Sequence, residues 1–464
     1  MKYVSTRGRA PALGFDDVLL SGLAADGGLF VPDAWPAIDP KKWQALAGLD
    51  YAALAAEIMA PFVVGSSAAA ALPKITAEAY GKFRHPAVAP LIQLGPNRWL
   101  MELFHGPTYA FKDYALQIVG RLFDHVLKAR GARVTIVGAT SGDTGSAAIE
   151  SVKGSQAADI FILHPAGRVS DVQRRQMTTV DAANVHNIAV EGTFDDCQNL
   201  VKAMFADERL RTELNLSAVN SINWARIMAQ VVYYVWAGLA LGAPHRKVAF
   251  SVPTGNFGNV FAGYVAAKMG LPVAKFIVGS NRNDILTRYF ETGAMTAEGV
   301  VPTLSPSMDI QISSNFERLL YEASERDAGA VRGYMASLKQ SSGFRIEEPA
   351  LNAIRAEFDA GKSTIEETAK TIANTLKASG YLLDPHTATA VHVAESAKNS
   401  APTIILGTAH PAKFPDAVHA ASGITPKLPE WLADLMERRE KFTVLPSDLK
   451  QVEEHISRLS RAAI

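Results

Sequence analysis

The sequence has few of the features that mark secreted, membrane or nucleic-acid-binding proteins. It contains one cysteine, Cys197, in 464 residues, so no internal disulfide can form. Its longest uninterrupted apolar stretch, residues 231–243, is shorter than the roughly 18–20 residues of a membrane span and favours a buried helix. The 46 basic residues balance 46 acidic ones, without any block of like charges, which argues against a nucleic-acid partner.

Targeting and metal signals are also lacking. The first residues carry charge but no apolar segment of the secretory type, so we expect a cytoplasmic protein with no membrane partner. The histidines are scattered and show no ligand spacing such as His-Glu-x-x-His, so we expect no metal site. We interpret Cys197 as a helix position without a redox role, since nothing near it in sequence suggests an activating base.

The chain length predicts more than one domain. We expect a small N-terminal domain of mixed structure at residues 1–97, an α/β region of two subdomains at 98–425, and a C-terminal helical extension at 426–464. Within the second region, residues 302–380 are mostly helical and charged in pattern, which indicates a position peripheral to any sheet.

From about residue 98 the pattern alternates between strands and helices. This alternation is typical of parallel βαβ units in a doubly wound sheet, whose ligands bind at the carboxyl ends of the strands. The predicted helices cover about 111–131 and 260–269, and the predicted strands cover 99–104, 134–137, 160–163, 248–252, 273–278 and 403–406.

Two glycine-containing loops follow predicted strands. In PTGNFGN, residues 253–259, the glycines allow a tight turn and the following helix start offers free N–H groups to an anion, although a simple turn has the same pattern. The absence of a Gly-Lys-Ser/Thr ending excludes a Walker loop. In ATSGDTGS, residues 139–146, the hydroxyl groups could bind a ligand, or Ser141 or Asp143 could cap the helix.

Lys112 lies in the run HGPTYAFKD, residues 105–113, at the predicted start of a helix. The positive end of the helix dipole destabilises an ammonium group there, and burial would add to this effect. A lysine with a lowered pKa suits a Schiff-base nucleophile. The residue pattern leaves a second interpretation open, in which Lys112 reaches solvent and pairs with Asp113.

The run around Lys112 resembles the lysine signature of threonine synthases, a branch of the tryptophan-synthase-β-like (fold type II) pyridoxal-phosphate enzymes. The similarity extends through further segments in the same order, namely STRG at 5–8, ADGGLF at 25–30, TSGDTG at 140–145, NSINWAR at 220–226, PTGNFGN at 253–259 and TAHPAKFP at 408–415. Together these segments span nearly the whole chain.

The resemblance implies an enzyme of threonine biosynthesis that converts O-phospho-L-homoserine and water into L-threonine and phosphate. It implies a Schiff base between Lys112 and pyridoxal 5'-phosphate, and contact between Thr408 and the pyridine nitrogen. The residues implied to bind the cofactor phosphate are Gly255, Asn256, Phe257, Gly258 and Asn259. An aspartate is expected among relatives at position 259, so the contact made by Asn259 is an open question.

The substrate adds a carboxylate and a phosphate that must also be bound. The residues expected near the carboxylate and the cofactor hydroxyl are Ser141, Gly142, Asp143 and Thr144. Those expected at the substrate phosphate are Asn223, Arg226 and Lys413, because a guanidinium fork and a lysine suit phosphate oxygens; capping or surface roles are the alternative. His105 and His410 could transfer protons or simply hydrogen-bond the backbone.

Two other functions are compatible with these motifs. A pyridoxal-phosphate-dependent serine/threonine dehydratase or phosphohomoserine phospho-lyase would stop before water adds to the substrate. A non-catalytic protein that binds phosphorylated metabolites would lack the visible absorption of a lysine-bound cofactor. The resemblance further implies a monomer or a weak homodimer.

Overall fold

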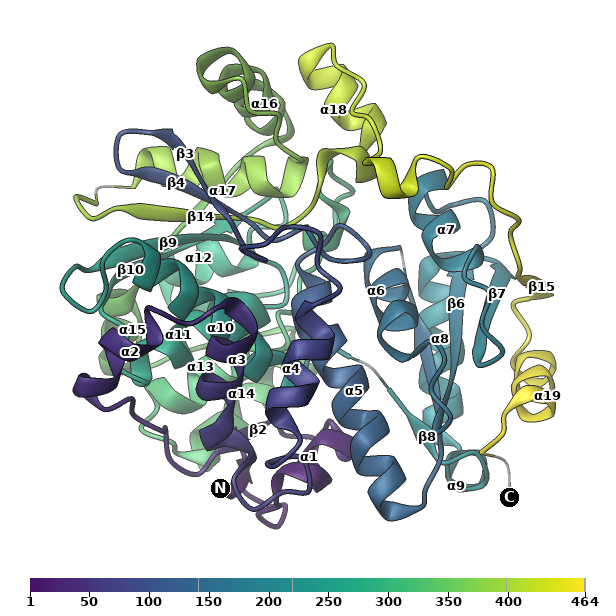
Figure 1. Cartoon of the computed structure of the whole chain (residues 1–464). Helices are drawn as coiled ribbons and strands as arrows, with labels where there is room; N and C mark the ends of the chain where they lie inside the picture. The colour runs from purple at the N-terminus through teal and green to yellow at the C-terminus, as the bar shows by residue number, and fades with distance from the viewer. Residues whose placement is uncertain (141, 219, 398, 463–464) are drawn as a thin grey trace.

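The computed structural model describes residues 1–140, 142–218, 220–397 and 399–462, and two mainly parallel sheets organise the chain (Figure 1). The larger sheet has the order β13 (Phe358–Lys362), β10 (Val273–Ser280), β9 (Val248–Pro253), β14 (Thr403–Gly407), β4 (Arg98–Glu102) and β3 (Leu91–Gly95). The second has the order β15 (Thr443–Pro446), β7 (Val185–Glu191), β6 (Ala158–Pro165), β5 (Val134–Ala139) and β8 (Leu216–Ser217). The predicted class, α/β with doubly wound mainly parallel sheets, is confirmed.

Helices connect and cover the strands. They include α5 (Lys112–Arg130), α6 (Asp143–Val152), α7 (Asp171–Thr178), α8 (Phe194–Ala206), α9 (Glu208–Glu213), α10 (Trp224–Ala240), α11 (Gly258–Lys268), α12 (Ile285–Thr292) and α17 (Pro385–Ser396). The others in this part of the chain are α13 (Phe316–Ala323), α14 (Ala328–Ser341), α15 (Glu348–Glu357), α16 (Ile365–Ser379) and α18 (Pro415–Ser422). Of these, α15 contacts β10 and β13, and α16 contacts β3.

The strand cores follow the hydrophobic pattern of the sequence. Every residue of β6 and of β9 is buried, as expected for parallel strands covered on both faces. The predicted helix at 111–131 is α5, which ends at Gly131 with a φ of 62°, a left-handed conformation that favours glycine.

The N-terminal region contains the antiparallel pair β1 (Tyr3–Ser5) and β2 (Phe30–Pro32) with α1 (Phe15–Ser21), α2 (Trp43–Leu46), α3 (Tyr51–Met59) and α4 (Leu72–Tyr80). The expected boundary at residue 97 falls inside a hairpin, because β3 pairs antiparallel with β4 and extends the larger sheet. Strand β3 is half-exposed at the sheet edge, so its pattern resembles that of a peripheral segment.

Two edge strands differ from the sequence-based expectation. Residues 302–380 are not wholly peripheral, because β13 pairs in parallel with β10. The C-terminal extension is not purely helical, because β15 pairs in parallel with β7 before α19 (Leu449–Leu459), at the right edge of Figure 1. Both strands are short and partly exposed, so backbone pairing forms them and their side-chain pattern carries little signal.

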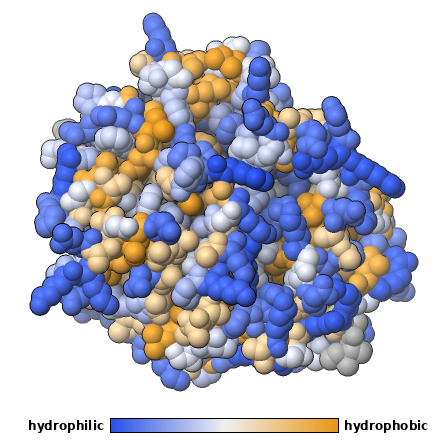
Figure 2. Space-filling view, viewed as in Figure 1, coloured by the Kyte–Doolittle hydropathy of each residue, from blue (hydrophilic) through white to orange (hydrophobic). Residues whose placement is uncertain are grey.

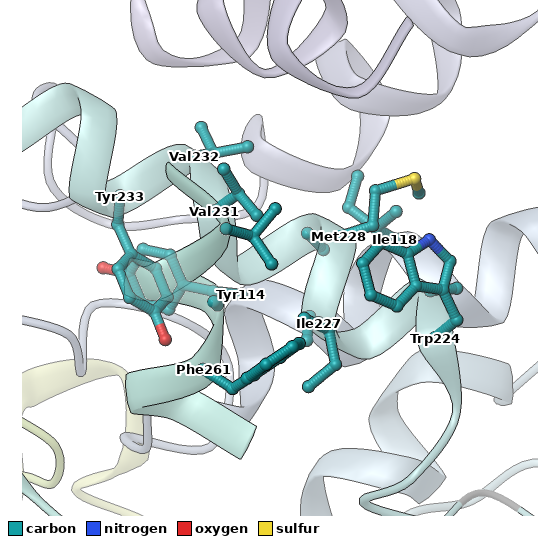
Figure 3. Close-up of a cluster of buried hydrophobic side chains, with 14 of the residues drawn as sticks. Tyr114, Ile118, Trp224, Ile227, Met228, Val231, Val232, Tyr233 and Phe261 are labelled. Atoms are coloured by element: carbon teal, nitrogen blue, oxygen red, sulfur yellow. The ribbon is translucent and has the colours of Figure 1, made fainter. Parts of the chain in front are cut away.

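The apolar stretch at 231–243 belongs mostly to α10, which packs against α3, α5 and α11. Figure 3 shows Tyr233 of α10 beside Tyr114 of α5, Ile227 of α10 beside Phe261 of α11, and Trp224 of α10 beside Ile118 of α5. Because neighbours surround α10, nearly all of its faces are buried, and this accounts for its nearly unbroken apolar sequence.

On the face shown in Figure 2, polar and apolar side chains are interspersed. Of the helices that the structure describes, none combines the length and apolarity required to span a membrane. Among the same described residues, no group of three or more histidine, cysteine, aspartate or glutamate side chains is arranged to hold a metal ion. Cys197 is buried in α8.

Candidate active site

A cavity of about 430 Å³ opens at the carboxyl ends of β5, β9 and β14, next to the start of α5. This is where ligands of doubly wound sheets bind. The predicted site residues that line it are Lys112, Thr144, Arg226, Gly255, Asn256, Phe257, Gly258, Asn259 and Thr408. Segments widely separated in sequence therefore meet around one space.

Lys112 is the first residue of α5 and is 8% exposed. Burial lowers the pKa of its ammonium group, and the positive charges of Lys413 and Arg226 act in the same direction, while Asp143 opposes them. Its Nζ lies 3.4 Å from Oδ2 of Asp143. The alternative in which Lys112 reaches solvent and pairs with Asp113 is wrong, because Lys112 is buried and its carboxylate partner is Asp143.

Asp113 instead fixes the loop that precedes Lys112. Its carboxylate accepts hydrogen bonds from the backbone N–H and the hydroxyl of Thr108, both at 2.7 Å. Gly106 lies directly against the Asp113 side chain: a Cβ added to Gly106 would be 2.5 Å from Cβ of Asp113. Tyr109 adopts a φ of 59°, which this close arrangement holds. The Gly-Pro-Thr-Tyr run is thus a compact turn, and it positions Lys112 in the cavity.

Asp143 is buried between two lysines. Its Oδ1 lies 2.9 Å from Nζ of Lys413 and accepts from Nε2 of Gln173 at 2.9 Å, while Oδ2 faces Lys112. Burial alone would raise the pKa of Asp143, but Lys413 and Lys112 outweigh it and hold the pKa well below its usual range. Asp143 begins α6 and makes no capping bond there, so it acts as the counter-ion of the two lysines.

Lys413 lies behind Asp143 and does not line the cavity. Its side chain is fully buried, and its Nζ also donates to the carbonyl oxygen of Thr108 at 2.7 Å and to Oε1 of Gln176 at 2.8 Å. Two hydrogen bonds and the ion pair with Asp143 therefore hold the ammonium group inside the protein. This geometry favours a role in holding Asp143 over the expected contact with the substrate phosphate.

The loop at residues 253–259 turns from β9 into α11. Phe257 has a φ of 62° and is the residue before the helix, so the first N–H groups of α11 point into the turn without intrahelical acceptors. At Gly255 an added Cβ would lie 3.0 Å from the carbonyl oxygen of Ser307, and at Gly258 it would lie 3.1 Å from Nδ2 of Asn315. Neighbouring segments thus leave little space for a side chain at either position.

Asn259 presents a buried donor beside this loop. Its Oδ1 accepts from the hydroxyl groups of Tyr233 at 2.6 Å and Tyr234 at 2.9 Å. Its Nδ2 is buried and has no hydrogen-bond partner among the described residues. A buried amide donor with a free N–H group beside a helix start is suited to bind an anion.

Arg226 is a second unsatisfied donor. It is 5% exposed, and its Nε and Nη1 have no partner in the part of the chain that the structure describes. Burial lowers the pKa of its guanidinium to about 10, which leaves it charged at neutral pH.

Asn223, the third residue expected at the substrate phosphate, caps α10: its Oδ1 accepts from the N–H of Ala225 and its Nδ2 donates to the carbonyl oxygen of Leu19. Asn223 does not line the cavity.

The loop at residues 139–146 is held mainly by its own contacts. The hydroxyl of Thr140 accepts from the N–H groups of Gly142 and Gly145, each at 2.9 Å. Gly142 has a φ of 143°, and an added Cβ would lie 2.6 Å from the Gln173 side chain. Of the four residues expected at the substrate carboxylate, Thr144 lines the cavity, Gly142 and Asp143 do not, and Ser141 lies outside the described residues.

Thr408 follows β14 and is 5% exposed. Its N–H donates to the hydroxyl of Thr387 at 3.1 Å, and its carbonyl oxygen accepts from the N–H of Phe111 at 2.9 Å. The residue that precedes Lys112 is therefore tied directly to Thr408, and both line the cavity.

His386 is a cavity residue that the sequence interpretation missed. It begins α17 beside Pro385, and its Nε2 accepts from the N–H of Ser307 at 3.3 Å while Nδ1 faces Asp384 at 3.2 Å. The Asp-Pro helix-start pattern at 384–385 is visible in the sequence, but it does not reveal that this start faces Lys112.

The two histidines proposed for proton transfer lie outside the cavity lining. Nε2 of His105 lies 2.7 Å from Oε2 of Glu102. Nδ1 of His410 accepts from the N–H of Ala412 at 3.1 Å, and burial lowers the pKa of His410 to about 4. The positions of His105 and His410 therefore favour a structural role over proton transfer.

Comparisons with known proteins cover the whole chain. Three family models match in succession: "Threonine synthase N terminus" at residues 2–80, "Pyridoxal-phosphate dependent enzyme" at 84–336, and "Threonine synthase, C-terminal" at 387–456. Threonine synthase of Pseudomonas aeruginosa is 56% identical over 460 residues, which cover 98% of each chain. Threonine synthase of Saccharomyces cerevisiae is 41% identical, over 100% of this chain and 97% of the yeast protein.

Solved structures agree. The crystal structure of pyridoxal-phosphate-bound threonine synthase from Brucella melitensis superposes with a TM-score of 0.98 at 60% identity, over 100% of both chains. Yeast threonine synthase superposes with a TM-score of 0.94 at 40% identity, over 99% of this chain and 98% of the yeast chain. This protein belongs to the threonine synthase family of pyridoxal-phosphate-dependent lyases.

Proposed function

We propose that this enzyme converts O-phospho-L-homoserine and water into L-threonine and phosphate, with Lys112 as the lysine that carries the cofactor. The observation that carries the proposal is that one cavity holds a buried amine together with buried N–H groups that have no hydrogen-bond acceptor among the described residues and could bind anions. Lys112, Arg226 and Asn259 all line it. Water supplies the hydroxyl group at Cβ, and the γ-phosphate leaves from Cγ.

The cavity residues fit pyridoxal 5'-phosphate. The amine of Lys112 would hold its aldehyde carbon. The start of α11, with Gly255, Asn256, Phe257, Gly258 and the free Nδ2 of Asn259, would hold its phosphate. The hydroxyl of Thr408 would face the pyridine nitrogen and, being neutral, would leave that nitrogen largely unprotonated. When bound, the cofactor supplies an electron sink that lets protons leave Cα and Cβ and lets the phosphate depart.

The protein's own groups supply proton transfer and binding. The lowered pKa of Lys112 favours its neutral amine, which can take a proton from substrate carbon and return it. Asp143 limits where that amine can move, because its Oδ2 lies 3.4 Å away. Lys413 in turn holds Asp143 in place.

Two substrate anions remain to be bound. Arg226 would bind the substrate phosphate with its free Nε and Nη1. Thr144, in the same loop as Gly142 and Asp143, would lie near the substrate carboxylate. His386, whose Nε2 accepts from the backbone of Ser307, would keep that segment against the cavity.

Product analysis tests this function. O-phospho-L-homoserine given to the cofactor-loaded enzyme should yield threonine and phosphate in equal amounts, and Lys112→Ala should abolish both. Release of 2-oxobutyrate without threonine would instead identify a dehydratase or a phospho-lyase.

We also propose that the enzyme acts in the cytoplasm, where its phosphorylated substrate would be made, and that it is a monomer or a weak homodimer. Light scattering measures the oligomeric state.

A further inference from the structure

A second cavity, of about 650 Å³, lies between the N-terminal segment, α13, α14 and the β11–β12 pair (Ala294–Thr296 and Gly343–Arg345). Helices α13 and α14 lie beside β2 at the lower left of Figure 1, where Val31, Tyr321 and Val331 pack together. This cavity shares no lining residue with the cavity around Lys112. Its volume is that of a small-molecule site.

Two N-terminal motifs without a role in the catalytic cavity build one wall. Asp26, from the ADGG turn, accepts from the hydroxyl of Ser5 at 2.7 Å and from the N–H of Gly28 at 2.9 Å. An added Cβ on Gly28 would lie 2.1 Å from Oγ of Ser5, and one on Gly27 would lie 3.0 Å from Nη1 of Arg7. The STRG and ADGG segments therefore pack closely against each other, with no space for a side chain at Gly28.

The two acidic side chains of the wall, Glu317 and Asp26, accept hydrogen bonds from the N-terminal segment. Glu317 accepts from Nε and Nη2 of Arg7 at 3.1 and 2.9 Å, and from the hydroxyl of Thr6 at 2.6 Å. Asp26 also accepts from the N–H of Arg9 at 2.7 Å. Glu317 is thus paired with Arg7, whereas the hydrogen-bond donors to Asp26 are neutral groups and Asp26 keeps its negative charge.

The lining carries more positive than negative charge, with Arg7, Arg9, Arg332 and Lys339 against Asp26 and Glu317. Arg9, Arg332 and Lys339 have no carboxylate within 4 Å in the part of the chain that the structure describes, although Nη1 of Arg332 donates to the carbonyl oxygen of Arg7. The rest of the lining is largely apolar: Leu29, Met295, Phe316, Leu320, Met335, Leu338 and Phe344. At the cavity edge Leu23 is 41% exposed and Ile312 is 60% exposed.

We propose that this cavity binds a small amphipathic anion, a carboxylate or phosphate ester with an apolar body, and that its occupancy changes the affinity for the cofactor. The unpaired cations would meet the anionic head, and the apolar side chains would cover the body. A cationic ligand would meet uncompensated positive charge, which makes an anion the occupant.

A short path joins this cavity to the cofactor-phosphate loop. Ser313, in its wall, donates its hydroxyl to the carbonyl oxygen of Gly255 at 2.7 Å. Asn315, which precedes α13, donates its N–H and Nδ2 to the carbonyl oxygen of Asn256, each at 3.1 Å. Phe316 lines the cavity and packs edge-on against Phe257, with ring centroids 4.9 Å apart.

A ligand that shifts residues 313–316 must therefore shift the loop as well. Because binding free energies are linked, a ligand that changes cofactor affinity has its own affinity changed by the same factor when cofactor binds. The proposal concerns binding and does not depend on which reaction the enzyme catalyses.

Fluorescence of 8-anilinonaphthalene-1-sulfonate, an amphipathic anion, tests the site on the cofactor-loaded enzyme. Arg9→Glu with Lys339→Glu should weaken dye binding at least about tenfold, the size expected for lost charge-assisted contacts. Ala336→Trp, which fills the cavity from α14, should weaken it too. Lys450→Glu on exposed α19 and Arg226→Gln in the catalytic cavity are the matched controls and should leave dye affinity unchanged.

Competition and cofactor release complete the test. Octanoate and octyl phosphate should displace the dye, whereas neutral octanol should not. Saturating octanoate should change the cofactor dissociation constant by about threefold or more, in the enzyme but not in Ala336→Trp. Equal dye binding by the charge-reversed variant, or equal displacement by octanol, would overturn the anion site. An unchanged cofactor dissociation constant would overturn the coupling.

Discussion

The backbone N–H of Phe111 donates to the carbonyl oxygen of Thr408 at 2.9 Å, nearly 300 residues further along the chain. This bond joins the residue before Lys112 to the residue proposed to face the pyridine nitrogen. An isolated bridge between Ala110 and Ala409 lies beside it. The two groups that would hold opposite ends of the cofactor ring are therefore fixed relative to each other by main-chain contacts.

Replacing Asp143 with asparagine should destabilise the protein by about 3 kcal/mol or more, because it leaves the charge of Lys413 buried without its partner. Urea unfolding monitored by circular dichroism measures the effect. Asp143→Asn combined with Lys413→Met should recover part of the loss, and Lys112→Ala, which leaves the Asp143–Lys413 pair intact, should cost less. Equal stability of wild type and Asp143→Asn would contradict the counter-ion role.

Asn259→Leu should weaken cofactor binding about tenfold or more, because the proposed phosphate contact of Nδ2 is lost and the Tyr234 hydroxyl loses its acceptor, while Tyr233 keeps Gln230. Tyr233→Phe should have a smaller effect in the same direction, since it only loosens the amide. Tyr289→Phe is the matched control, because the buried Tyr289 hydroxyl has no partner among the described residues. Cofactor titration would argue against this assignment if Asn259→Leu bound as tightly as Tyr289→Phe.

His410 should make the protein sensitive to mild acid. Its pKa falls from an ordinary value near 6.5 to about 4, chiefly because of burial. The folded pKa is below the unfolded one, so the stabilisation is fully present above about pH 6.5 and is lost as pH falls towards 4, about 3 kcal/mol in all. His410→Asn should show a flatter decline in unfolding free energy over this interval. A parallel decline in both proteins would disprove the contribution.

Much of the fold could be predicted because buried parallel strands and long helices have strong local patterns. Strands β5, β9, β10 and β14 and helix α5 all coincide with predicted segments. Edge strands β13 and β15 could not be predicted in this way, since the backbone of a neighbouring strand, and not their own side-chain pattern, holds them in the sheet.

The residues of the candidate site also fall into two groups, those with a local sequence signal and those placed only by tertiary contacts. The glycine loop and Lys112 could be located from sequence because glycine geometry and the family motifs are local signals. The positions of Asn223 and Lys413 could not, because only tertiary contacts show that one caps α10 and the other lies behind Asp143. His386 enters the cavity through the placement of α17, which no local pattern reports.

The most direct test of the central claim is to locate the lysine that carries the cofactor. The cofactor-loaded enzyme is reduced with borohydride, digested, and its peptides are measured by mass spectrometry. We predict that the pyridoxyl group is found on the peptide containing Lys112 and that Lys112→Ala carries none. Modification of another lysine, Lys413 above all, with Lys112 unmodified, would contradict the account.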